Sequence, residues 1–86
     1  MTITTVSTEV TEALAVIDEG LFYSTTNEVV SNGIAVNALL DTRNKVGFNK
    51  TAVEAVDAAL KDLGPSAVKG TWLSTNLAAI RVLIAS

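Results

Sequence analysis

The side chains of this sequence that could do chemistry are carboxylates in two close pairs, Glu9 with Glu12 and Asp18 with Glu19. Such pairs can serve acid–base catalysis or supply oxygen ligands to Ca²⁺. The first pair, however, is typical of the acidic first turn of a helix, where negative charge meets the positive end of the helix dipole. The second lacks the Asp-x-Asp-x-Asp-Gly loop of an EF-hand. We therefore expect neither a catalytic nor a metal site at these residues.

The segment DTRNKVGFNK is the only basic cluster that contains an aromatic residue, with Arg43, Lys45 and Lys50 around Gly47 and Phe48. Such a loop could contact a phosphate backbone or stack on a base. Useful affinity for nucleic acid normally needs a larger basic surface than three residues in a chain of net charge −3. The sequence predicts no nucleic-acid binding, and the segment is interpreted as a solvated loop between helices or a contact between subunits.

The sequence contains no cysteine and no histidine. A thiolate nucleophile, a Ser-His or Cys-His pair and the usual zinc sites therefore cannot be built from this chain alone. Glycine-rich phosphate-binding patterns are also missing from the sequence. We predict a non-enzymatic protein without a cofactor.

Composition favours self-association. Of the 86 residues, 49% are hydrophobic and 17% are charged, whereas an average soluble domain has about 25% charged residues. So much apolar material is hard to bury in one small domain, which predicts an apolar contact patch and a homo-oligomer.

Charge is divided unevenly between the two halves of the chain. Residues 1–42 carry six acidic and no basic residues, whereas residues 43–86 carry six basic and three acidic residues. The two halves are therefore expected to be complementary, either by packing on each other within one fold or by meeting between subunits.

Neither end of the sequence looks like a targeting or membrane segment. The N-terminal MTITTVSTEV lacks the basic and apolar regions of a signal peptide. The run from Leu77 to Ala85 is interrupted by Arg81 and is far shorter than the ~20 residues that span a bilayer. We expect a soluble protein without membrane contact, located in the cytoplasm or in a virion-like assembly.

Apolar spacing predicts one all-α domain, residues 1–86, with residues 1–7 as a flexible or partner-ordered arm. In the first helix, Ser7 or Thr8 is the expected N-cap and Gly20 marks a weak or ending turn. The expected helices, joined by short connections that make successive helices antiparallel, are 8–21, 26–44, 50–63 and 66–85.

The third helix has the clearest end signals. Thr51 and Glu54 have the spacing of a capping box, and Asn49 is an alternative N-cap. Gly64-Pro65 is typical of a helix end. The fourth helix is expected to begin with a short turn interrupted at Gly70.

The pair Asn32-Gly33, within VVSNGIAV, has two interpretations. It is a strong signal for a two-residue β-hairpin, which would make the fold α+β. Thr25 and Glu28 also form a capping-box pattern at the start of a helical repeat. Because an isolated hairpin is marginally stable in water, we favour the helix, with Asn32-Gly33 as a break or kink.

Three groups of residues are predicted to form contacts between subunits. The fourth helix is apolar over an arc too broad for one buried edge. The small-residue face of the third helix, formed by alanines, and the basic loop 41–50 offer further contacts. The eight candidates are Trp72, Ala79 and Leu83, then Ala52, Ala55 and Ala59, and finally Arg43 and Lys45. These features favour a self-assembling structural subunit of a homo-oligomer or a larger, virion-like particle; the alternative is a small helical adaptor or regulator that binds another protein.

Overall fold

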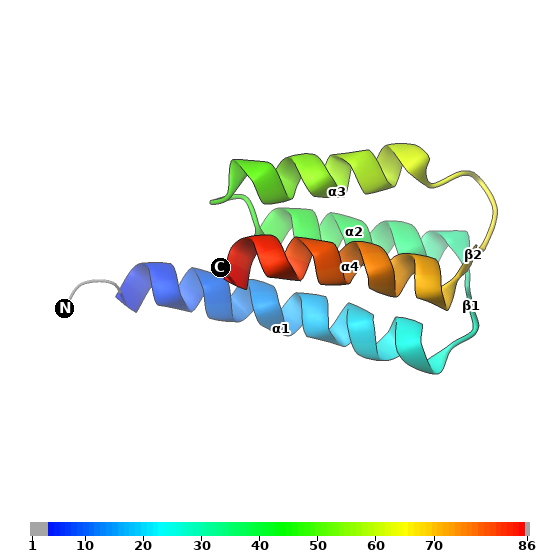
Figure 1. Ribbon diagram of the computed structural model, residues 1–86, viewed down its shortest axis with the longest axis horizontal. Helices are drawn as coiled ribbons and strands as arrows, with labels where there is room; N and C mark the ends of the chain where they lie inside the picture. Colours follow the sequence, from blue (N-terminus) through cyan, green and yellow to red (C-terminus); the bar gives the residue numbers. More distant parts are fainter. Residues whose placement is uncertain (1–3, 86) are drawn as a thin grey trace.

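The computed structural model describes residues 4–85, which form four helices and one two-stranded sheet (Figure 1). The predicted all-α bundle is confirmed. Residues 1–3 of the predicted arm lie outside the described residues, and the rest of that arm is helical. The elements are α1 (Thr4–Thr26), β1 (Val29–Val30), α2 (Asn32–Lys45), α3 (Lys50–Asp62), β2 (Val68–Lys69) and α4 (Gly70–Ala85).

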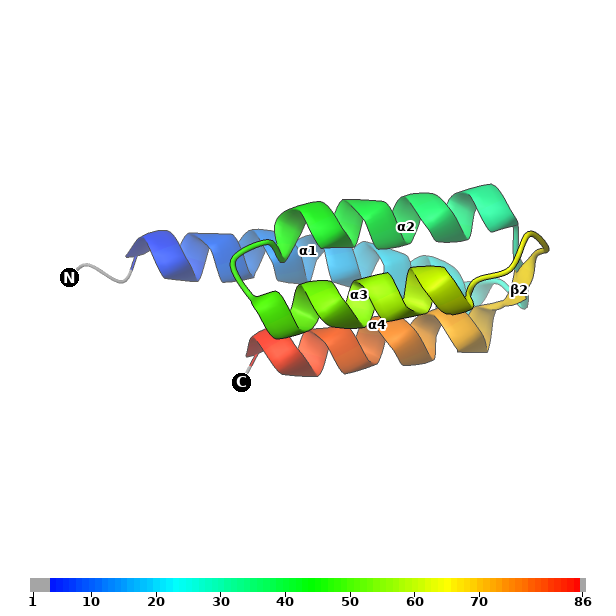
Figure 2. The same ribbon diagram turned by 90° about the horizontal axis from the view of Figure 1, so that it is seen from above.

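The helices form an antiparallel ring. Each of them packs on two neighbours, in the order α1, α2, α3, α4 and back to α1. Figures 1 and 2 together show α1 diagonally across from α3, and α2 diagonally across from α4. Both strands lie at one end of the bundle, and the α2–α3 turn and the C-terminus lie at the other.

The core lies between the four helices and is made mostly of medium-sized aliphatic side chains. α1 and α4 form the most extensive of the helix contacts. Gly20 allows this close approach, because a Cβ atom there would come within 2.7 Å of Leu77 Cδ1. The fully buried large side chains include Ile17, Val30, Leu39, Val46, Val56, Leu73, Leu77 and Ile80.

α1 is longer than predicted at both ends. It begins at Thr4, so neither Ser7 nor Thr8 is the N-cap and Glu9 and Glu12 lie beyond the first turn. It also continues through Gly20 to Thr26. The predicted helix end at residue 21, based on Gly20 as a weak or ending turn, was wrong because a glycine can serve close helix packing as well as helix termination.

The prediction of one helix over 26–44 was also wrong. Thr25 lies in the last turn of α1, so it does not begin a capping box with Glu28. Ser31 is the true N-cap, and its hydroxyl accepts a hydrogen bond from Ile34 N at 3.3 Å. Asn32 and Gly33 are the first residues of α2, so they form neither a hairpin turn nor a mid-helix kink.

The short strands explain why the chain leaves the helical path before Ser31. Val29 pairs with Lys69, and Val30 pairs with Val68, in antiparallel register. Val30 is fully buried, so the strand places a β-branched side chain under the end of the core. Val68 follows its partner Val30 by 38 positions along the chain, so a local helical pattern cannot reveal this pairing.

α3 matches its prediction closely. It runs from Lys50 to Asp62, and the N-cap is Asn49, whose side chain accepts a hydrogen bond from Ala52 N at 3.0 Å. The alternative N-cap, Asn49, is therefore confirmed, and the prediction of Thr51 as the cap of a capping box with Glu54 was wrong. α4 begins at Gly70, and β2 occupies the place of the expected helical turn before it.

Candidate interaction surfaces

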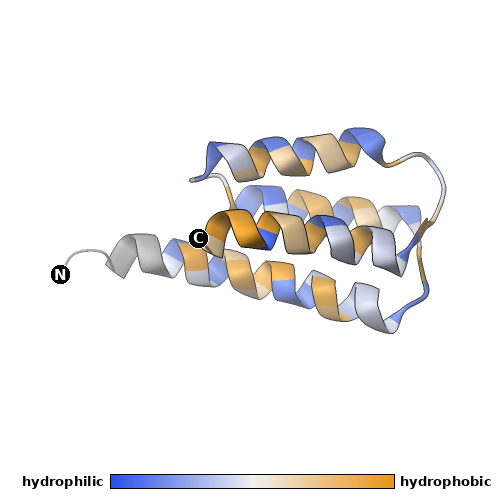
Figure 3. Cartoon of the chain, viewed as in Figure 1, coloured by the Kyte–Doolittle hydropathy of each residue, from blue (hydrophilic) through white to orange (hydrophobic). Residues whose placement is uncertain are grey.

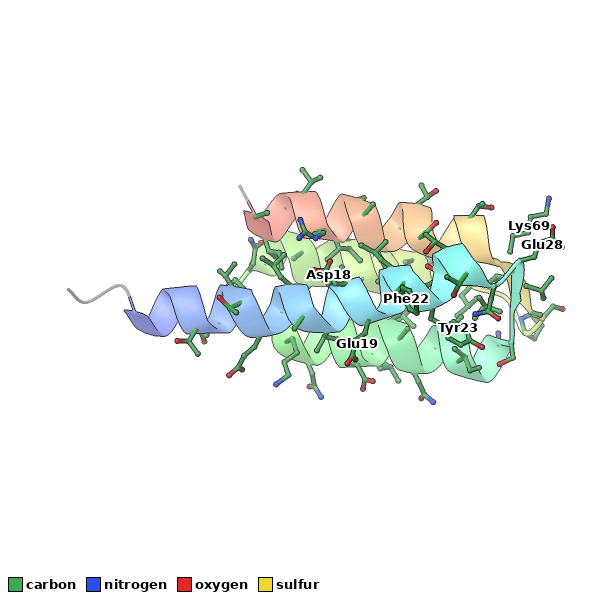
Figure 4. The ribbon with its side chains drawn as sticks, turned by 90° about the horizontal axis from the view of Figure 1, so that it is seen from below. Asp18, Glu19, Phe22, Tyr23, Glu28 and Lys69 are labelled. Carbon is green, nitrogen blue, oxygen red and sulfur yellow. The ribbon has the colours of Figure 1, made fainter. Side chains whose placement is uncertain are left out.

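A large hollow lies at the strand end of the bundle and is rich in hydroxyl groups. It has a volume of about 750 Å³ and is formed where the end of α1 meets β1 and the start of α4. The hydroxyls of Ser24, Thr26 and Ser74 already donate to carbonyls of their own helices. Glu28 and Lys69 lie close together at this end (Figure 4). The hollow can offer hydrogen bonds to a polar group, and the hydrogen bonds of Ser24, Thr26 and Ser74 go to backbone carbonyls rather than to Glu28 or Lys69.

A second surface is nearly without charge and lies on the outer side of α1 and α4. Phe22 on α1 and Val82 on α4 are the most exposed large apolar side chains among the described residues, at 71% and 66%. Small and hydroxyl side chains fill the rest of it. We call this surface the α1/α4 face; its exposed members are Ala15, Phe22, Thr75, Ala78, Val82 and Ala85, around an ion pair of Asp18 with Arg81.

The ion pair at the centre of the α1/α4 face is closely matched. Arg81 Nε donates to Asp18 Oδ1 at 2.8 Å, and the Nη2 group donates to Oδ2 at 3.5 Å. The hydrogen bonds from Arg81 lower the pKa of the Asp18 carboxyl and raise the pKa of the guanidinium. Both groups therefore stay charged at neutral pH and cancel each other, which leaves this face with no net charge.

The hydropathy of α4 changes along its length. Figure 3 shows its last turns in orange on the side toward the viewer and its first turns in paler colours. The first turns carry Thr71, Ser74 and Thr75. On the exposed side of α4, the apolar surface is therefore concentrated toward the C-terminal end.

A third surface, between α1 and α2, is acidic. It is a groove of about 240 Å³ whose lining includes Glu19 and Asp41 but neither lysine nor arginine. Figure 4 shows Glu19 and Tyr23 on the α2 side of α1, whereas Asp18 lies toward α4. We call this surface the α1/α2 groove; its lining is Val16, Glu19, Gly20, Ile34, Asn37, Ala38 and Asp41.

The carboxylate pairs of the sequence are split by the fold. Asp18 is engaged by Arg81, whereas the adjacent Glu19 points into the α1/α2 groove. Glu12 Oε1 lies 3.7 Å from Lys45 Nζ, and Glu9 is exposed. Neither pair converges on a shared site.

The predicted α4 contact residues lie partly inside the bundle. Trp72 is half-buried, and its Nε1 donates to Asp62 Oδ2 at 3.2 Å. Leu83 is half-buried and packs against the core, whereas Ala79 is exposed. This side of α4 therefore has a neighbour within the chain, namely α3, and the role of these residues between subunits stays a prediction.

The other candidates also have intrachain surroundings. Ala52 and Ala59 are buried in the core, and Ala55 is half-buried beside them. Arg43 forms a bidentate pair with Asp57, at 2.6 Å and 3.2 Å, which lowers the pKa of that carboxyl. The small-residue face thus serves the packing of α3 inside the bundle.

Sequence reasoning passed over Phe22 and Val82 as contact residues. Phe22 is five residues after the buried Ile17, which places it on the opposite side of a continuous helix. That signal was hidden because the first helix was predicted to end at residue 21, just before Phe22. Val82 follows Ile80 by two residues and precedes Ile84 by two, so helical spacing alone could have placed it outward.

Comparison with models of protein families, with curated proteins and with solved structures gave no match for this chain. The function must therefore be argued from the chain's own surfaces. Within the described residues, the helices are too short or too polar to cross a membrane.

Proposed function

We propose that the protein is a non-enzymatic, self-associating structural subunit and that two copies pair through the α1/α4 face. The observation that carries this proposal is the pairing of two large exposed apolar residues, Phe22 and Val82, with a surrounding surface of no net charge. A chain of net charge −3 repels its copies at most orientations. A neutral face is where two copies meet without that repulsion.

Symmetry favours the same face on both partners. A two-fold dimer uses one self-complementary patch twice, which suits a surface whose only ion pair is satisfied internally. A standard contact buries roughly 800 Å² per partner. The accessible surface of the chain is 5213 Å², so two exposed helices side by side can supply such an area. A larger or virion-like particle would require a second, different contact on every copy.

The test is a substitution of Val82 by lysine, Val82→Lys, followed by sedimentation equilibrium. Both copies of a two-fold dimer would then place a cation at the contact, and we expect the dissociation constant to rise at least about tenfold, or about 1.4 kcal/mol. A lysine near the C-terminal end of α4 suits the helix dipole. Helix content by circular dichroism should therefore stay unchanged.

Val29→Lys is the matched control, because Val29 is a 62% exposed valine in β1 at the strand end of the bundle. It should keep the mass of the unmodified protein. Equal masses for Val82→Lys and Val29→Lys would contradict the α1/α4 dimer. An unmodified protein that is monomeric at every concentration would instead favour the adaptor, which awaits a different partner on the same face.

A further inference from the structure

The turn between α2 and α3 carries an exposed aromatic residue next to a free cation. Phe48 is 39% exposed and Lys50 is exposed. The other two basic residues of this segment are engaged within the chain, Arg43 by Asp57 and Lys45 by Glu12. Among the ion pairs of the described residues, none includes Lys50.

This turn is held in place from both sides. Val46 N donates to Thr42 O at 2.9 Å, and Asn49 N donates to Val46 O at 2.9 Å. The Asn49 side chain also caps α3. Phe48 is therefore presented from a hydrogen-bonded turn, so little conformational entropy would be lost when it docks. We call Gly47, Phe48 and Lys50 the tip.

The α1/α2 groove has the opposite chemistry. Its apolar lining, Val16, Ile34 and Ala38, includes an isoleucine that is 41% exposed. Glu19 and Asp41 add two carboxylates that no ion pair of the described residues neutralises. The small Gly20 and Ala38 leave room between the helices. Such a groove suits one apolar side chain with a cation beside it.

We propose that the tip of one copy docks into the α1/α2 groove of a second copy. Phe48 would cover Ile34 and Ala38, and Lys50 would face Glu19 and Asp41. This contact adds a second interface to the proposed self-assembly, and its biological role rests on that proposed function. The chain itself supplies the matching occupant, with its aromatic residue two positions before its free cation.

Tip and groove are separate surfaces, so the contact is head-to-tail. The turn lies at the end of the bundle opposite the strands (Figure 2), whereas the groove runs between two helices on its side. Each docked copy therefore keeps one open tip or groove, and association can continue. Together with the two-fold α1/α4 dimer, this second contact would give assemblies larger than a dimer.

The experiment uses chains that also carry Val82→Lys, which removes the proposed α1/α4 dimer and isolates the head-to-tail contact. Phe48→Ser disables the tip, and Asp41→Lys disables the groove. Each of these two chains should be monomeric alone. A 1:1 mixture should form a dimer and nothing larger, because only one intact tip and one intact groove remain.

Glu28→Lys is the control for charge, since Glu28 is an exposed carboxylate at the strand end of the bundle, outside both surfaces. In the Val82→Lys chain it should leave head-to-tail association intact. A second variant tests polarity: Lys50→Glu should abolish association, and adding Asp41→Lys to the same chain should restore at least part of it.

The proposal is overturned if the Val82→Lys chain is monomeric, if Phe48→Ser leaves its association unchanged, or if the mixed chains do not combine. Binding of a foreign lysine-rich peptide to the groove without self-association would also overturn the second copy as occupant. These results leave the test of the α1/α4 dimer unaffected, because that test rests on Val82→Lys alone.

Discussion

Gly33 and Gly70 lie at equivalent places, in the first turn of α2 and of α4, but their surroundings are opposite. Beyond the adjacent residues and backbone of its own helix, no atom of the described residues lies within 4 Å of a Cβ built at Gly33, whereas a Cβ at Gly70 would overlap the backbone oxygens of Asn27 and Ser24. Gly70 N also donates to Glu28 O at 2.9 Å. The absence of a side chain at Gly70 is what lets α4 begin against the end of α1.

The two glycines give a paired stability prediction. Gly33→Ala should stabilise the protein by up to about 1 kcal/mol, because alanine is a better helix former and meets no obstacle. Gly70→Ala should destabilise it by on the order of 3 kcal/mol, since backbone atoms must move apart. Urea unfolding of both variants measures the difference. A loss of stability in Gly33→Ala would contradict the helical start of α2.

At single residues, the sequence predicted the role correctly where that role depends only on residues nearby in the sequence. Asn49, named as an alternative cap, is the cap of α3. The prediction failed where the role depends on a neighbour distant in sequence. Trp72 lacked a partner in the linear pattern, yet Asp62 lies within hydrogen-bond distance of its indole nitrogen. Gly20 and Gly70 likewise owe their roles to other helices.

At the scale of elements, the start of α2 is fixed by contacts that a helical period does not contain. Ser31 caps the helix, and the side chain of Asn32 donates hydrogen bonds to Gly64 O and Ser66 O. Asn32 thus ties α2 to the connection between α3 and β2. This role explains why an Asn-Gly pair between β-branched residues occurs outside a hairpin.

Replacing Asn32 by alanine should loosen this tie. Two hydrogen bonds are lost, each with a net value of about 0.5–1.5 kcal/mol, so we expect Asn32→Ala to lower the free energy of unfolding by roughly 1–3 kcal/mol. Asn44→Ala is the control, because Asn44 is exposed on the same helix outside the proposed contact surfaces, and surface changes are usually within about 0.5 kcal/mol. Equal unfolding midpoints in chemical denaturation would show that the tie contributes nothing.

At the scale of the whole molecule, the uneven charge of the two halves is used within the fold. Two of the ion pairs join an acidic residue of the first half to a basic residue of the second, Asp18 with Arg81 and Glu12 with Lys45. The bundle order explains this result, since α1 lies between α2 and α4. The remaining charge differs between the two surfaces of α1. The α1/α2 groove is acidic, and the α1/α4 face is neutral.

This distribution predicts that salt separates the two proposed contacts. Screening weakens exposed opposite charges, and the Debye length falls from roughly 10 Å at 0.1 M to about 3 Å at 1 M salt. The tip-to-groove contact of Lys50 with Glu19 and Asp41 should therefore weaken, while the apolar contact around Phe22 and Val82 should persist. Sedimentation velocity on the unmodified protein should show assemblies that shrink to dimers as salt rises. Monomers at high salt would mean instead that charge holds the dimer together, and the neutral α1/α4 face could not then be its interface.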